Sequence, residues 1–75
     1  MSPAKAFGVV LRRIRRERGL SQEQLGFEAD LRRTFVSVLE LGQQQPTITT
    51  IFKLSKALRL KPSELINQVE REIEN

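Results

Sequence analysis

A chain of 75 residues, 39% hydrophobic and 29% charged, can bury one modest core, and it contains no apolar run long enough to cross a membrane. The absence of cysteine and histidine excludes a disulfide, a structural zinc site, a histidine general base and a Ser-His-Asp triad. No secretory signal opens the chain, so we expect a cytoplasmic protein without a membrane partner.

The formal net charge of +4 is unevenly distributed. Residues 1–33 carry eight basic and four acidic side chains, whereas residues 34–75 carry five of each. A basic segment suits a polyanionic partner such as nucleic acid, and it suits a solvated helix face equally well. Charge alone does not separate these two interpretations.

The first predicted helix ends at Gly19, because glycine after a basic residue is a typical C-terminal stop. Its apolar residues recur at helical spacing and form one stripe. They are Phe7, Val10, Leu11 and Ile14.

A second helix is predicted to begin after Ser21, which forms an S-x-x-Q capping box with Gln24. We expect Leu25 and Ala29 to face the core. We also expect Asp30 to end this helix in a left-handed conformation, which aspartate tolerates better than most residues.

The third predicted helix covers about Arg33–Leu41, with Val36 and Leu39 inward and Gly42 as its stop. Polar residues 43–45 and a proline then form a loop. No alternation of apolar and polar residues suggests a strand anywhere in the chain.

Two further helices are predicted, the fourth capped by Thr47 and the fifth, about 62–74, beginning at Pro62. The residues expected to be buried in the fourth are Ile48, Ile51, Leu54, Ser55 and Leu58. The apolar residues of the fifth are Leu65, Ile66, Val69 and Ile73. We therefore expect one compact all-α domain of five helices over residues 1–75.

The second and third helices, residues 21–41, are separated by about three residues, which is the spacing of a helix-turn-helix. The second helix of such a pair can enter the major groove of DNA, where residues near its N-terminus reach the base edges. Those residues are Arg33, Thr34, Ser37 and Val38. Each is also an ordinary residue for a solvated helix surface, so the pattern around them has to decide.

That pattern resembles the Cro/C1-type, or XRE, family of helix-turn-helix regulators. The resemblance lies in LRRIRRERGLSQEQL at residues 11–25, LRRTFVSVLELG at 31–42, PTI at 46–48 and LSKAL at 54–58, and it spans about residues 7–66. An aromatic residue at Phe27 and the Arg-Thr-aromatic run at 33–35 look most like controller proteins of restriction-modification systems.

The resemblance implies a lambda-repressor-like fold in which the third helix reads double-stranded DNA. It assigns phosphate contacts to Gln22, Gln43 and Gln44, and a structural ion pair to Arg15 and Glu40. Arg32 departs from the family pattern, because it stands where a capping serine or threonine is common, and it becomes a further candidate for phosphate contact.

The fifth helix carries an apolar stripe longer than one small core requires, so we expect a homodimer with Val69 and Ile73 at its interface. The leading functional hypothesis is a sequence-specific transcriptional regulator that binds palindromic DNA. The alternative is a protein-interaction module, such as an antitoxin or a co-activator scaffold. No enzyme activity is expected, because no cluster of acidic residues supports a carboxylate hydrolase. No cofactor, metal or small-molecule ligand is expected either.

Overall fold

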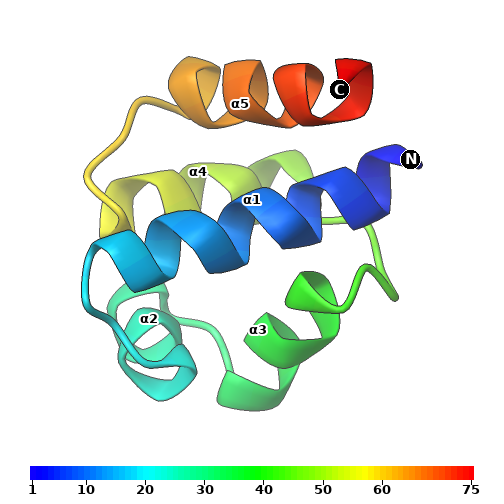
Figure 1. The fold of residues 1–75 in the computed structure, drawn as a ribbon. Helices are drawn as coiled ribbons and strands as arrows, with labels where there is room; N and C mark the ends of the chain where they lie inside the picture. Colours follow the sequence, from blue (N-terminus) through cyan, green and yellow to red (C-terminus); the bar gives the residue numbers. More distant parts are fainter.

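The computed structural model describes residues 1–75 and contains five helices and no strands (Figure 1). The helices are α1 (Pro3–Glu17), α2 (Gln22–Ala29), α3 (Arg33–Glu40), α4 (Ile48–Ala57) and α5 (Pro62–Glu74). The all-α, five-helix fold expected from the sequence is confirmed. None of the five helices has the length and hydropathy that a membrane span requires.

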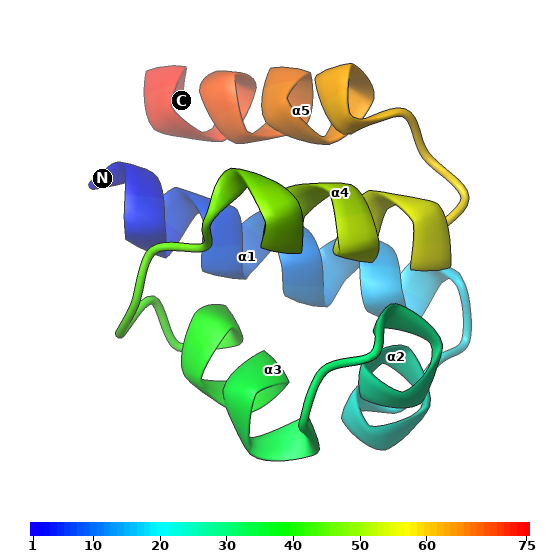
Figure 2. The same ribbon diagram turned by 180° about the vertical axis from the view of Figure 1, so that it is seen from behind.

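Helix α1 is the centre of the arrangement. It packs against α5 on one side and against α3 on the other, and α2 packs against both α3 and α4. Figure 2, seen from behind, shows α4 in front of α1, with α5 above it and the α2–α3 pair below. The α2–α3 pair and α5 therefore lie on opposite sides of α1.

Local sequence signals set the helix ends as expected. The Ser21 hydroxyl accepts a hydrogen bond from the Gln24 N–H, and the Gln24 side chain accepts one from the Ser21 N–H. Asp30 ends α2 with φ 56° and ψ 47°, in the left-handed region. Thr47 caps α4 by accepting from the Thr50 N–H, and Pro62 occupies the first turn of α5.

The core is built from fourteen buried hydrophobic side chains contributed by all five helices. Ile48 is not among them, so the expectation that it is buried is wrong: its exposed fraction is 70%. The inward positions of that first turn of α4 belong to Thr50 and Ile51, and Ile48 faces solvent. Ser55 is fully buried as expected, and its hydroxyl donates to the Ile51 carbonyl at 2.7 Å within the same helix.

The apolar residues of α5 fall into two groups. Leu65 and Val69, one turn apart, are buried in the core, whereas Ile66 and Ile73 are 44% and 39% exposed. Val69, predicted to lie at a dimer interface, is 7% exposed in the single chain, so most of its surface already packs in the core and Ile73 offers the larger apolar surface of the predicted pair. The apolar residues of α5 therefore lie on two sides of the helix, one facing the core and one facing solvent.

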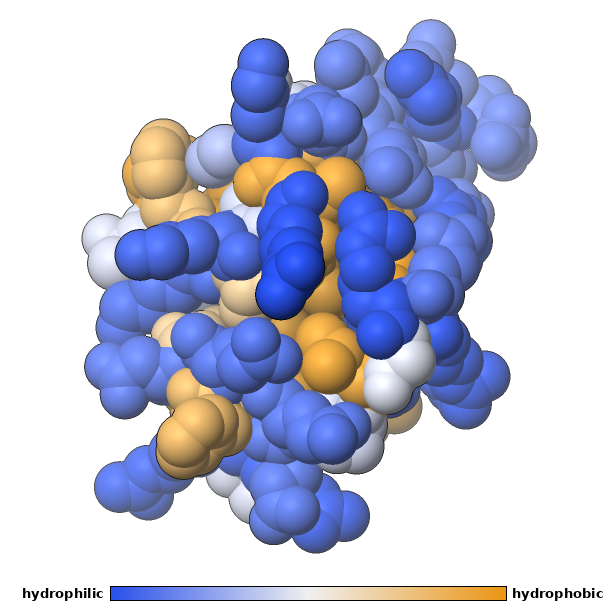
Figure 3. All heavy atoms as spheres, turned by 90° about the vertical axis from the view of Figure 1, so that its left-hand side faces the viewer, coloured by the Kyte–Doolittle hydropathy of each residue, from blue (hydrophilic) through white to orange (hydrophobic).

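Two arginine side chains of the α1 region make hydrogen bonds to other helices. Arg13 of α1 donates to Glu72 and Gln68 of α5, at 2.9 and 3.3 Å. The Arg18 Nε donates to the Leu58 carbonyl, at 3.0 Å, beside the C-terminal end of α4. Figure 3 views the side of the molecule on which α1 ends, and hydrophilic side chains there cross an apolar centre. These side chains cover apolar surface with their aliphatic stems.

Gly8 allows α1 and the end of α3 to approach each other closely. A Cβ added at this position would lie 2.5 Å from the Glu40 carbonyl oxygen and 2.6 Å from that of Leu39. Both are backbone atoms of the helix end, so they cannot move aside as a flexible side chain would. The position of α3 against α1 therefore depends on the missing side chain.

We expect Gly8→Ala to lower the free energy of unfolding by about 1–3 kcal/mol, because the clash outweighs the roughly 1 kcal/mol that alanine gains by helix propensity. Chemical denaturation monitored by circular dichroism measures the change. Gly19→Ala is the contrasting change: Gly19 has φ 70° and no atom within 4 Å of an added Cβ, so its cost of about 1–2 kcal/mol comes from the left-handed backbone alone and involves no clash. A Gly8→Ala protein as stable as the parent would show that α3 can shift without penalty.

Candidate nucleic-acid interface

The outer face of α3 carries the four side chains predicted to reach bases. Arg33 and Thr34 are exposed, and Ser37 and Val38 are partly exposed. On the opposite face, the buried residues Val36 and Leu39 fix the rotation of the helix about its axis. The four residues thus share one solvent-facing surface, with two hydrogen-bonding groups, one guanidinium and one small apolar side chain.

The N-terminal end of α3 concentrates positive charge. Arg32 is the N-cap residue, and its side chain makes no capping hydrogen bond. No acidic residue occupies the first turn, where Arg33 follows directly. Arg32 and Arg33 place two positive charges at the positive end of the α3 helix dipole, which is unfavourable. An anion bound there would reduce this repulsion.

The loop between α3 and α4 supplies two further candidates. Gln43 and Gln44 are both exposed, and neither side chain has a hydrogen-bond partner within the chain. Gly42 precedes them with φ 72°, a conformation that glycine adopts without strain. The side-chain amides of Gln43 and Gln44 are therefore free to bind an external group.

The structure brings Arg15 of α1 and Glu40 of α3 together in a two-pronged ion pair. The Arg15 Nε lies 2.6 Å from Glu40 Oε2, and its Nη2 lies 3.1 Å from Oε1. The third donor, Nη1, reaches the Leu20 carbonyl at 2.7 Å. The two side chains are only 10% and 3% exposed. One guanidinium therefore joins α1, the loop before α2 and the end of α3.

Hydrogen bonding to the Glu40 carboxylate raises the pKa of Arg15 above its ordinary value, against the opposing effect of burial. Arg15 is therefore charged throughout the physiological pH range.

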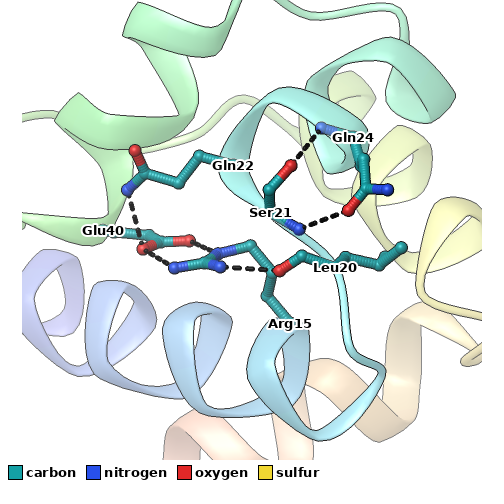
Figure 4. Close-up of polar contacts among 6 residues, drawn as sticks. All are labelled: Arg15, Leu20, Ser21, Gln22, Gln24 and Glu40. Carbon is teal, nitrogen blue, oxygen red and sulfur yellow. Dashed lines mark hydrogen bonds and ion pairs between the residues drawn. The ribbon is translucent and has the colours of Figure 1, made fainter.

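Gln22, at the start of α2, joins the same network. Its Nε2 donates to Glu40 Oε1 at 3.0 Å, and Figure 4 shows the side chain extending from α2 toward the carboxylate. An amide nitrogen carries two N–H donors, so one is left for an external phosphate. The side chain predicted to hold DNA is thus also a link between α2 and α3.

The bond between Gln22 and Glu40 is the feature of the site that the sequence did not indicate. The two residues are 18 positions apart and lie on different helices, so helical periodicity carries no signal for their contact. The Gln22 role came from family resemblance, which points to DNA and not to an internal partner.

Comparison with known proteins places this geometry in a family. The helix-turn-helix family model matches residues 11–65. The control protein C.BamHI of Bacillus amyloliquefaciens is 42% identical over 62 residues, covering 81% of this chain and 76% of that protein. The control protein C.MunI of a Mycoplasma species is 36% identical over 67 residues, covering 88% of this chain and 90% of that protein.

Solved structures agree with the sequence relatives. The restriction-modification controller protein C.AhdI of Aeromonas hydrophila has a TM-score of 0.80 and 42% sequence identity, and the match covers 83% of this chain and 94% of that chain. Fold, interface geometry and relatives together define a DNA-binding transcriptional regulator with a helix-turn-helix. The chain belongs to the helix-turn-helix family, and its relatives include restriction-modification control proteins, as the resemblance implied.

We expect Arg15→Ala to lower the free energy of unfolding by about 3–5 kcal/mol, because it leaves the Glu40 carboxylate buried without its cation. The double change Arg15→Met with Glu40→Leu removes both charges together and should recover much of this loss. Thermal and urea denaturation of the parent, the single variant and the double variant measure it. A single variant that melts like the parent would show that the pair contributes nothing to stability.

Proposed function

We propose that this protein is a homodimeric regulator that binds palindromic double-stranded DNA in the bacterial cytoplasm and controls the expression of a restriction-modification system. The observation that carries the DNA-reading part is the outer face of α3, where Arg33, Thr34, Ser37 and Val38 share one surface beside a helix end rich in positive charge. The likeness to restriction-modification control proteins supports the regulated system.

In this proposal α3 enters the major groove and the four residues of its outer face contact base edges. Arg33 would bind guanine O6 and N7 with two hydrogen bonds, and Val38 would contact a thymine methyl group. Thr34 and Ser37 can each donate or accept, so they suit several bases. Gln22, Arg32, Gln43 and Gln44 would hold phosphates on either side of the groove and fix the register.

Two copies are proposed because one eight-residue helix reads few base pairs. The apolar surface for dimerisation includes Ile48 and Phe52 on α4 and Ile66 and Ile73 on α5, which are 70%, 57%, 44% and 39% exposed. Ile66 lines an apolar pocket with Pro46 and Ile51, so this part of α5 adjoins the start of α4. Ile73 retains its expected place at the interface, while Val69 belongs to the core.

Selection of bound sequences from random duplex DNA tests the proposed function directly. The expected result is an inverted repeat whose half-sites are centred about one helical turn, roughly 10 base pairs, apart. The spacing follows from a two-fold axis that relates the two copies of α3. Failure to enrich any sequence would overturn sequence-specific binding, and a single unrepeated site would overturn the two-fold arrangement.

Binding to the selected DNA site then tests the role of Arg33. The Arg33→Ala variant should lose about 1–3 kcal/mol of binding free energy and relax the preference at one base pair in each half-site. Arg71→Ala, which removes an exposed arginine from α5, is the matched control and should bind like the parent. An equal loss on every DNA sequence would show that Arg33 contacts phosphate instead.

We expect the double variant Phe52→Asp with Ile66→Asp to be a folded monomer, because both side chains are exposed in the single chain and four charges would meet across the interface. Sedimentation equilibrium should show a monomer–dimer equilibrium for the parent and monomer alone for the variant. The contrasting Val69→Asp change places a charge in the core and should prevent folding. A parent that is monomeric at high micromolar concentration, both free and on DNA, would contradict the dimer.

A further inference from the structure

Some of the basic side chains of α1 bind partners within the chain, and others do not. Arg13 is bound to Glu72 and Gln68, Arg15 to Glu40 and the Leu20 carbonyl, and Arg18 to the Leu58 carbonyl. Lys5, Arg12 and Arg16 are exposed, and their side chains make no hydrogen bond or ion pair. The fold leaves these three cations unused.

The three unused cations share one side of the helix. At 100° per residue, Lys5, Arg12 and Arg16 fall within about 40° of one another around the helix axis. We call this set the α1 basic stripe. It extends over three turns of α1, on a side that neither α3 nor α5 covers, with Lys5 at one end, the exposed Val9 on the middle turn, and Arg12 and Arg16 at the other end.

Both ends of the α1 basic stripe border the predicted DNA surface. At one end, the Lys5 Cα and Cγ lie 2.9 Å from the position of a Cβ added to Gly42, the residue before the loop that carries Gln43 and Gln44. At the other end, Arg12 and Arg16 line a shallow depression together with Glu40. Glu40 accepts a hydrogen bond from Gln22, so that end adjoins the start of α2.

The local charge balance leaves the stripe strongly positive. Glu40 lines the depression, but Arg15 already neutralises its carboxylate. Arg13, which also lines it, is paired with Glu72. Glu17 is the one acidic side chain of the depression without a basic partner. Against it stand the guanidinium groups of Arg12 and Arg16, so the surface favours an anion.

We propose that the α1 basic stripe binds backbone phosphates of the DNA duplex beside the groove that α3 reads, and so extends the contact beyond the helix-turn-helix. The inference rests on the proposed DNA-binding function. Two guanidinium groups and one ammonium group without hydrogen-bond partners in the chain suit phosphate, because they offer several donors and permanent positive charge. Such contacts strengthen binding to every sequence alike and carry no base information.

The salt dependence of DNA binding tests the stripe. Each phosphate contact contributes about 0.9 to the slope of log K against log salt, so Arg12→Gln with Arg16→Gln should reduce that slope by about 2 per subunit. At about 0.1 M salt, affinity should fall at least roughly tenfold, by the same factor on the selected site and on unrelated duplex. Glutamine keeps most of the side-chain length while it removes the charge.

Two control variants separate charge from structure. Arg12→Lys with Arg16→Lys keeps both charges and should retain the parental slope. Arg71→Gln removes one exposed charge from α5 and should leave the slope unchanged. Melting temperature should be the same in all of these proteins, because neither Arg12 nor Arg16 has a partner in the fold.

The outcomes distinguish this inference from the proposed function on which it rests. A parent protein that binds no duplex defeats the proposed function itself. A parent that binds DNA with a slope that the two glutamines leave unchanged defeats the stripe alone. A loss confined to the selected site would also overturn the inference, because it would make these arginines base contacts.

Discussion

The buried bond between Arg15 and Glu40 is the contact on which the geometry of the interface depends. Helix α3 has eight residues and no side-chain cap at its N-terminus, so it is too short to hold its shape alone. The buried face of α3 fixes its rotation about its own axis. The position of α3 along and against α1 is fixed at Glu40, because Arg15 donates two hydrogen bonds to that carboxylate. The absence of a side chain at Gly8 permits that end of α3 to lie directly on α1.

A buried ion pair contributes little net stability, because the cost of removing two charges from water offsets most of their attraction. Here the gain is in geometry. The Glu40 carboxylate accepts from both Arg15 and Gln22, while Arg15 also donates to the Leu20 carbonyl, so one charge pair connects α1, α2 and α3. A phosphate held by Gln22 would therefore be held in a fixed relation to the bases below α3, which is what reading a sequence in register requires.

The sequence predicted the helices and their ends well, because the signals are local: the Ser21 capping box, the left-handed Asp30, Thr47 and Pro62 all act within a few residues. It predicted the inward face of α1 for the same reason. It failed at Ile48, and it did not separate the buried Val69 from the exposed Ile66 and Ile73, because apolar residues there occupy two sides of one helix and periodicity does not tell which side the neighbouring helices cover. The Gln22–Glu40 bond joins separate helices and has no local signal at all.

The basic residues of α1 point in different directions and contact different helices. Arg15 orients α3 and Arg13 holds α5, so the two act on opposite sides of the same helix. A two-fold contact through α4 and α5 would leave α3 of each copy uncovered, because α5 lies across α1 from α3 (Figure 1). The acidic residues Glu70, Glu72 and Glu74 also lie on α5, away from the proposed DNA surface. The proposed DNA surface and the proposed dimer surface thus lie on different sides of the molecule, and α1 packs between the helices that carry them.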